Sequence, residues 1–99
     1  EGAVAQGIGY ALYEDVRLKA DGRWVDGFTE YLIPTAEDMP ARLESVILEI
    51  PTPDEPLGLK GIGEMGLVPT APAIANAVYD ATGVRVTSLP ITADKLVSV

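Results

Sequence analysis

The stretch Lys60-Gly61-Ile62-Gly63-Glu64-Met65-Gly66 is the part of the sequence around which the chain is organised. Its three glycines surround a single carboxylate. Glycine lets the backbone adopt positive φ and lets another molecule approach the main chain closely. A proline-rich run precedes the stretch and a helical pattern follows it, so Glu64 is expected on a constrained loop at the start of a helix. There it is either a turn residue favoured by the helix dipole or a working acid/base.

Composition narrows the chemistry that the chain can perform. The 99 residues form one domain at most, and 47% hydrophobic residues are too many for a disordered chain. The net charge of −8 argues against nucleic acid and anionic membranes as partners. Without Cys or His, the chain has no disulfide, no thiolate or imidazole metal ligand and no Ser-His-Asp triad. We expect no metal ligand, no signal peptide, no membrane span and a cytoplasmic location.

The first residues already follow a helical pattern. The chain begins Glu1-Gly2-Ala3-Val4 without an initiator Met. We therefore expect a piece of a larger protein, with surfaces that normally meet missing neighbours.

Two stretches predict helices. Apolar residues recur with helical spacing near residues 1–14, and a second pattern near 71–82 has Thr70 as its N-cap and Gly83 as its end. The glycines of the first helix predict either close approach of another body or tight helix packing. One side of this helix carries Gly2, Gln6, Gly9 and Tyr13.

The remaining apolar stretches predict strands. Asp21-Gly22 is a hairpin turn signal within residues 16–25, and the nearly continuous apolar run 44–50 predicts a strand buried on both faces. Shorter pieces at 31–33, 84–86 and 89–91 read as strands too, whereas the prolines of 51–56 predict an extended linker. The predicted fold class is α+β, with a mainly antiparallel sheet and two principal helices.

The glycine stretch also matches a dinucleotide-binding fingerprint by its letters. Gly61 to Gly66 reads G-x-G-x-x-G, but that motif must directly follow a strand, and a proline-rich run precedes it here. The same placement would aim Glu64 at a pyrophosphate. A Walker loop fails as well, because no Ser or Thr follows Lys60. A nucleotide-binding module is therefore the weaker alternative.

Two separated motifs resemble one known family. Lys60-Gly61-Ile62-Gly63-Glu64, followed by a helix reading Ala-Pro-Ala-Ile-Ala-Asn-Ala-Val, is similar to the C-terminal end of the molybdenum-binding large subunits of xanthine dehydrogenases and aldehyde oxidases. Residues 1–12 resemble the E-G-x-x-x-Q-G-x-G segment of that family. The resemblance covers essentially residues 1–99, which it implies to be a C-terminal fragment of a molybdopterin-binding domain.

The resemblance implies a role for six residues. Glu64 matches the glutamate that acts as general base on the molybdenum-bound hydroxide. Gln6, with its neighbour Gly7, matches the segment that contacts the pterin. In that family a backbone loop lies beside the cofactor, and this loop is matched here by Lys60, Gly61 and Gly63. The sequence departs from the better-known animal pattern after Glu64, where Met65-Gly66 replace prolines.

The same resemblance implies cofactors and partners. The family hydroxylates a carbon next to nitrogen or an aldehyde carbon, with water as oxygen source, in a small-molecule substrate. Closeness to bacterial members implies the cytosine dinucleotide form of molybdopterin. Iron–sulfur clusters and FAD are expected elsewhere, on subunits or domains that join the rest of the molybdenum subunit. The isolated chain is expected to be inactive and to self-associate through the face of Gly2, Gln6 and Gly9. The alternative is a non-enzymatic interaction domain that keeps this fold.

Overall fold

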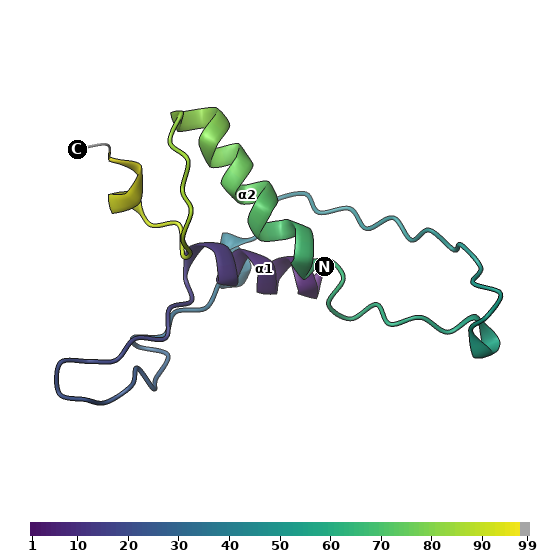
Figure 1. The fold of residues 1–99 in the computed structure, drawn as a ribbon, viewed down its shortest axis with the longest axis horizontal. Helices are drawn as coiled ribbons and strands as arrows, with labels where there is room; N and C mark the ends of the chain where they lie inside the picture. Colours follow the sequence, from purple (N-terminus) through teal and green to yellow (C-terminus); the bar gives the residue numbers. More distant parts are fainter. Residues whose placement is uncertain (98–99) are drawn as a thin grey trace.

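Two crossing helices hold together a chain that is otherwise extended. The computed structural model describes residues 1–97. Within them lie the α-helices α1 (Gly2–Leu12) and α2 (Leu67–Thr82), and 3-10 turns at Ala36–Asp38, Pro56–Gly58 and Ala93–Leu96. Figure 1 shows the loop of residues 44–66 extending to one side of the helices and residues 13–35 to the other. The radius of gyration is 17.2 Å, against about 13 Å for a compact chain of this length.

The predicted antiparallel sheet is wrong. Within residues 1–97 the structure has no strand, and its β pairing consists of one isolated antiparallel bridge between Leu18 and Trp24. The α+β class is therefore replaced by two helices with long irregular connections. Strand propensity reports how well a residue fits a pleated, half-buried surface. It does not supply the neighbouring strand that the backbone groups need, and these stretches lack that neighbour.

The predicted turn of the hairpin is present. Gly22 has φ +83° and donates its N–H to the carbonyl of Lys19 at 2.9 Å. The N–H of Lys19 in turn bonds the carbonyl of Arg23 at 2.7 Å, and that of Val25 bonds Arg17 at 3.0 Å. The chain reverses where Asp21-Gly22 predicted, but the pairing stops within a few residues.

Both predicted helices are confirmed, although α2 begins earlier than predicted. α2 starts at Leu67 and takes Gly66 as its N-cap, so Thr70 is not the cap. The Thr70 hydroxyl instead donates to the carbonyl of Gly66 at 2.6 Å, one turn back. Gly83 ends the helix as predicted, with φ +72° and its N–H bonded to the carbonyl of Tyr79 at 2.8 Å. Neither helix of residues 1–97 is long and apolar enough to cross a membrane.

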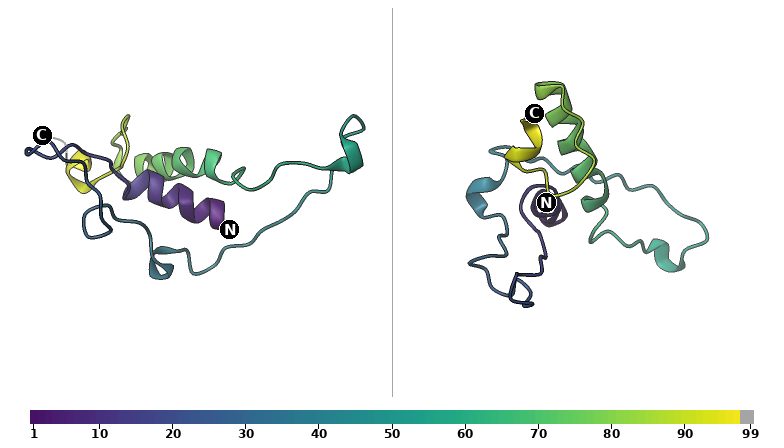
Figure 2. Two further views of the ribbon diagram at one scale, coloured as in Figure 1. Left: turned by 90° about the horizontal axis from the view of Figure 1, so that it is seen from below. Right: turned by 60° about the vertical axis from the view of Figure 1, so that its left-hand side comes forward.

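α1 and α2 approach each other closely at one glycine. The views in Figure 2 agree that the two helices lie side by side. A Cβ atom added to Gly7 would lie 2.5 Å from the Cβ of Thr70, which is closer than real atoms pack. Tight helix packing is therefore the reason for Gly7. Gly9 is also buried, and an added Cβ would lie 2.9 Å from the Cδ of Pro34. The exposed face predicted for Gly2, Gln6 and Gly9 is thus wrong at Gly9.

The core is small and sits at the helix crossing. Its buried apolar side chains are Ile8, Ala11, Ala71 and Ile91. The N–H of Ile91 donates to the carbonyl of Ala11 at 2.7 Å, which ties the C-terminal segment to the end of α1.

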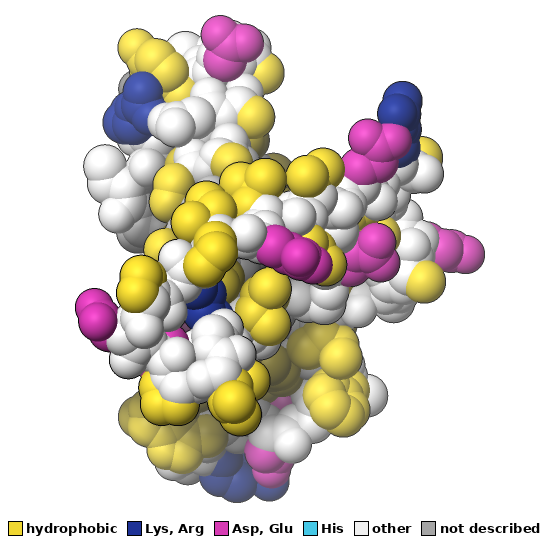
Figure 3. Space-filling view, turned by 90° about the vertical axis from the view of Figure 1, so that its right-hand side faces the viewer, with side chains coloured by type: hydrophobic (Ala, Val, Ile, Leu, Met, Phe, Trp, Pro, Cys, Tyr) yellow, Lys and Arg dark blue, Asp and Glu magenta, His cyan; other side chains and the backbone are white. Residues whose placement is uncertain are grey.

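Many large apolar side chains remain outside this core. The run 44–50, predicted to be buried on both faces, is exposed, with Val46 at 82% and Leu48 at 75%. That prediction is wrong because no other part of residues 1–97 covers the run. Figure 3, viewed from the end where residues 50–60 project, shows hydrophobic side chains open over much of the surface.

Candidate functional site

The glycine loop, residues 60–66, contacts the first turns of α1 through its own C-terminal end. Gly66 is the N-cap of α2 and lies against the first turns of α1. A Cβ added to Gly66 would lie 3.3 Å from the Cβ of Ala3 and 3.6 Å from a methyl carbon of Val4. The loop is therefore held against α1 immediately after Glu64.

The two residues that the sequence motifs single out meet in space. Gln6 Nε2 donates a hydrogen bond of 3.2 Å to Glu64 Oε1, although 58 positions separate them. Both side chains are exposed. The main chain at Glu64 is also fixed, because its carbonyl accepts the N–H of Leu67 at 3.1 Å. α1 supplies the amide, the glycine loop supplies the carboxylate, and the helix crossing brings them together.

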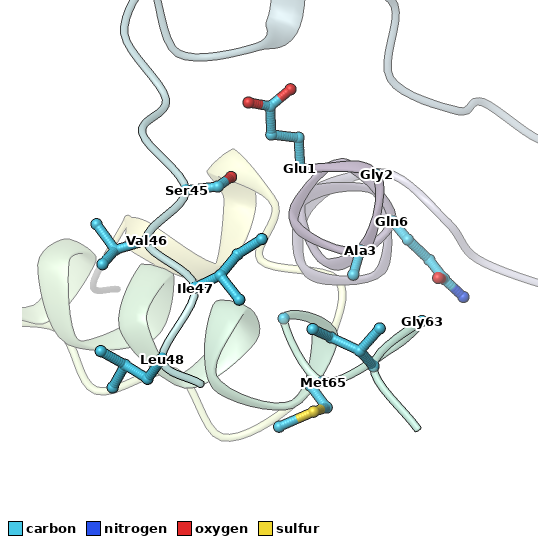
Figure 4. Close-up of a pocket in the computed structure, with 12 residues that line it drawn as sticks. Glu1, Gly2, Ala3, Gln6, Ser45, Val46, Ile47, Leu48, Gly63 and Met65 are labelled. Carbon is cyan, nitrogen blue, oxygen red and sulfur yellow. The ribbon is translucent and has the colours of Figure 1, made fainter. Parts of the chain in front are cut away.

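An open hollow of about 620 Å³ has Gln6 in its lining, whereas Glu64 lies outside the lining, between the lining residues Gly63 and Met65. Figure 4 shows Ile47 pointing toward α1, whereas Val46 and Leu48 point to the opposite side. The lining is contributed by the start of α1, by the run 45–48 and by the glycine loop. Its residues are Glu1, Gly2, Ala3, Gln6, Ser45, Val46, Ile47, Leu48, Ile62, Gly63, Met65 and Gly66.

Sequence reasoning missed the wall formed by the run 45–48. Its apolar pattern predicted a buried strand, and nothing in that pattern indicates which distant segment it faces. Ile62 and Met65 were also passed over, although their places beside the loop glycines were the available signal.

The other predicted site residues lie in different surroundings. Gly63 lines the hollow, and a Cβ on Gly61 or Gly63 would meet no atom within 4 Å. The backbone at both glycines is therefore open to approach. Lys60 lies outside the lining and donates a hydrogen bond to the carbonyl oxygen of Ile50. Gly7 faces Thr70 in the helix contact. The catalytic role of Glu64 stays a prediction, as do the cofactor roles of Gln6, Gly7, Lys60, Gly61 and Gly63.

The dinucleotide alternative gains no support from the local structure. The 3-10 turn Pro56–Gly58 precedes Gly61, and within residues 1–97 no strand leads into the loop. The fingerprint requires a strand at that place.

Two tyrosine–carboxylate pairs anchor the loop of residues 13–38 at the other end of α1. Tyr13 donates to Asp38 Oδ1 at 2.9 Å, and Tyr31 donates to Glu14 Oε2 at 2.6 Å. Each bond raises the pKa of its phenol, because the neutral hydroxyl is the donor. Hydrogen bonds from the N–H and hydroxyl of Thr35, and then from Tyr13, lower the pKa of Asp38. The side chains of these two tyrosine–carboxylate pairs lie outside the hollow, and they hold the loop of residues 13–38 in place.

Comparison with known proteins identifies the class. A family model described as a molybdopterin cofactor-binding domain matches residues 1–40, which include α1 and Gln6. Over 96% of the chain, the structure superposes with a TM-score of 0.81 and 34% identity on quinoline 2-oxidoreductase from Pseudomonas putida 86, of which it covers 12%. Residues 1–40, with α1, therefore match a molybdopterin cofactor-binding domain, and the arrangement of both helices recurs in the Pseudomonas enzyme.

Curated relatives are similar to this chain over nearly all of its length. The chain is 41% identical to the gamma subunit of the 6-hydroxypseudooxynicotine dehydrogenase complex of Paenarthrobacter nicotinovorans, over 98% of its own length. It is 42% identical to the aldehyde oxidoreductase molybdenum-binding subunit PaoC of Escherichia coli, over 96% of its length. The chain is similar to one part of the molybdenum-binding subunits of a xanthine dehydrogenase and an aldehyde oxidoreductase. It spans 13% of the length of these relatives.

Proposed function

We propose that this chain forms one wall of the molybdenum cofactor site of a larger oxidoreductase subunit, with Glu64 as the general base. The observation that carries the proposal is the Gln6–Glu64 hydrogen bond at the rim of an open hollow. It joins the two residues singled out by separate motifs of the family. The remaining residues proposed to lie beside the cofactor are Gly7, Lys60, Gly61 and Gly63.

The groups around the hollow suit an organic cofactor better than a bare metal ion. The chain has neither His nor Cys, so the residues proposed to hold the cofactor offer amide and carbonyl groups and the ammonium of Lys60. Gly61 and Gly63 leave their backbone open, and backbone amides can bind the oxygens of an anionic group. The cofactor would supply the oxidation–reduction chemistry. The cytosine dinucleotide form is part of the proposal.

The side chain of Glu64 is both accessible and held in place. Its side chain is exposed and is held by a neutral amide donor. Among residues 1–97 no lysine or arginine forms an ion pair with it. Glu64 would accept a proton from the water that supplies the oxygen atom.

The proposed reaction is hydroxylation of a carbon next to nitrogen in a heterocycle, or of an aldehyde carbon. Relatives named for quinoline and for aldehydes support these two substrate classes. The electrons would leave through iron–sulfur clusters and FAD on partner subunits or domains. Because the chain offers one wall of the site, we propose that it is inactive alone and acts with the rest of the molybdenum subunit. The cytoplasmic location expected from the sequence stays a prediction.

The decisive experiment is Glu64→Gln in the full-length molybdenum-binding subunit. Glutamine keeps the size and the hydrogen-bonding reach of the side chain but cannot take up the proton. We expect molybdenum and pterin contents equal to the unaltered enzyme and a turnover lower by about 100- to 10,000-fold. The matched control is Glu55→Gln, an exposed glutamate in the part of the loop that projects away from the helices, which should keep its turnover. Near-normal turnover of the Glu64→Gln enzyme would refute the role of Glu64 and favour a non-enzymatic interaction domain.

A further inference from the structure

Three contacts along one face of α1 fix the glycine loop and the start of α2. Each contact joins one residue of α1 to one residue of the loop or of α2, and the pairs are Ala3–Gly66, Gln6–Glu64 and Gly7–Thr70. Residues three and four positions apart lie on the same face of a helix, so the three residues of α1 form one row. Figure 4 shows Ala3 and Gln6 on the side of α1 that faces the loop.

Position 66 is occupied by glycine because of the space beside it and not because of its backbone. Gly66 has φ −70° and ψ −17°, which are ordinary right-handed helical values. A Cβ added there would lie 3.3 Å from the Cβ of Ala3, closer than the usual carbon–carbon contact of about 3.5–4.0 Å. The next atoms belong to Val4, at 3.6 and 3.8 Å. The methyl group of Ala3 therefore leaves no room for a methyl group on residue 66.

A methyl group added to residue 66 would displace the loop rather than the helices. The Cβ of an alanine has no rotamer by which it could move aside. One turn further on, the helices already meet so closely that a Cβ on Gly7 would lie 2.5 Å from the Cβ of Thr70. In the loop, by contrast, a Cβ on Gly63 would meet no atom within 4 Å. Close-packed helices resist displacement, so the shift falls on the open loop that carries Glu64.

The hydrogen bond between Gln6 and Glu64 tolerates little displacement. Its length of 3.2 Å is at the upper end of the range for N–H···O bonds, about 2.7–3.2 Å. Relieving a carbon–carbon contact of 3.3 Å to about 3.5–4.0 Å moves the loop away from α1 by a few tenths of an ångström. A displacement of that size takes the amide and the carboxylate beyond about 3.5 Å, where no hydrogen bond remains.

We infer that Ala3 and Gly66 are positioning residues, whose contact seats the glycine loop on α1 at the distance that keeps Glu64 within reach of Gln6. This inference rests on the proposed function and deepens it. Neither residue carries a group that transfers a proton, since one side chain is a methyl group and the other is a hydrogen atom. Their contribution to turnover is geometric and passes through Glu64.

Moving the methyl group from one partner to the other tests this contact in the full-length subunit. Gly66→Ala overfills the contact and Ala3→Gly empties it, so each change alone should loosen the loop. The double variant refills the contact, because without the Cβ of Ala3 the nearest atom to the new methyl group is a carbon of Val4 at an ordinary 3.6 Å. The effects of the two changes should therefore be strongly non-additive.

Hydrogen exchange of the Leu67 amide reports on the loop without any need for turnover. That N–H bonds the carbonyl of Glu64 at 3.1 Å. We expect its exchange to be at least about threefold faster in each single variant and close to the unaltered rate in the double variant. The matched control is Gly27→Ala in the opposite loop, where a Cβ would lie at an ordinary 3.7 Å from the Oγ1 of Thr29. Exchange at Leu67 should be unchanged in this control.

Turnover distinguishes positioning of the base from a purely structural role. In Gly66→Ala, kcat per bound molybdenum should fall about tenfold, because a small misplacement of a reacting group is costly. KM should stay within about twofold, since the lost interaction acts in the transition state. The double variant should recover most of kcat, and Gly27→Ala should keep both values.

Two results would overturn the inference. One is unaltered exchange and turnover in Gly66→Ala. The other is a double variant as impaired as Gly66→Ala, since the new methyl group would then act by filling the hollow and not through Ala3. If Gly66→Ala does not fold, the double variant still decides, because it should exchange more slowly at Leu67 than Ala3→Gly does.

The two proposals fail separately. An active Glu64→Gln enzyme would refute the base, and exchange at Leu67 would still decide whether Ala3 and Gly66 seat the loop. An inactive Glu64→Gln enzyme together with normal exchange and turnover of Gly66→Ala would refute the positioning role alone.

Discussion

Gln6 Nε2 and Glu64 Oε1 are joined by a hydrogen bond of 3.2 Å that spans 58 positions of the chain. The amide sits on α1, and the carboxylate sits on the glycine-rich loop that leads into α2. The bond therefore transmits the position of α1 to the carboxylate. We therefore expect Gln6 to position Glu64, in addition to its proposed contact with the cofactor.

Replacing Gln6 should loosen the glycine loop. Gln6→Leu removes the donor while keeping a good helix former. Hydrogen exchange of residues 61–66 should become faster, with the helical circular dichroism unchanged. Turnover of the full-length enzyme should fall about 10- to 100-fold, because a small misplacement of a reacting group is costly. Gln6→Glu should loosen the loop further, since two carboxylates would then face each other. Loop exchange that is the same in Gln6→Leu and unaltered protein would contradict the positioning role.

The helix crossing should be sensitive to a single methyl group at Gly7. Gly7→Ala places a carbon 2.5 Å from the Cβ of Thr70, so the helices must separate at a cost of about 1–3 kcal/mol. Gly2→Ala is the matched control, because a Cβ there meets no atom within 4 Å. Chemical unfolding followed by helical circular dichroism compares the two variants.

A double variant checks the cause of the Gly7 effect. Adding Thr70→Gly to Gly7→Ala removes the clashing Cβ, so the two changes should be strongly non-additive. Simple addition of the two costs would show that the contact does not limit the packing.

Removing the left-handed glycine at the end of α2 should destabilise that end. Gly83 has φ +72°, where a Cβ costs roughly 1–2 kcal/mol. Gly83→Ala should carry this cost, whereas Gly83→Asn should carry less, because Asn tolerates the conformation better. Urea midpoints of the two variants measure the difference. Equal midpoints would mean that the turn relaxes out of the left-handed region.

The turn at residues 35–38 should weaken in acid and in strong base. Hydrogen bonds from Thr35 lower the pKa of Asp38 below its ordinary value of 3.8. Because the folded pKa is the lower one, this stabilisation is complete above about pH 3.8 and is lost as the pH falls through the folded pKa. The pKa of Tyr13 is raised above its ordinary value of 10.0, so its contribution to stability depends on pH in the opposite direction. Its contribution is complete below pH 10.0 and is lost as the pH rises through the folded value.

Titration followed by NMR at Thr35 checks the acid limb, with Asp38→Asn as the control. The amide signal of Thr35 should move with pH in the unaltered protein and stay constant through the same range in Asp38→Asn. A titration of Thr35 that survives the Asp38→Asn change would assign the effect to another group.

The sequence by itself determined the features with local causes. Helical spacing of apolar residues predicts α1 and α2, Gly83 predicts where α2 ends, and Asp21-Gly22 predicts the chain reversal. Each depends on residues within a few positions of one another, where propensity and turn chemistry act. The family motifs indicated Gln6 and Glu64, but they did not indicate that the two side chains lie next to each other.

Only the tertiary structure decided the rest. Whether the run 44–50 finds a strand to pair with depends on distant residues, and here it finds none within residues 1–97. The start of α2 moved back to Leu67 because Gly66 packs on α1. Gln6 reaches Glu64 because Gly7 lets α2 approach within contact of α1. Periodicity describes one element at a time, whereas these three outcomes depend on which elements lie next to each other.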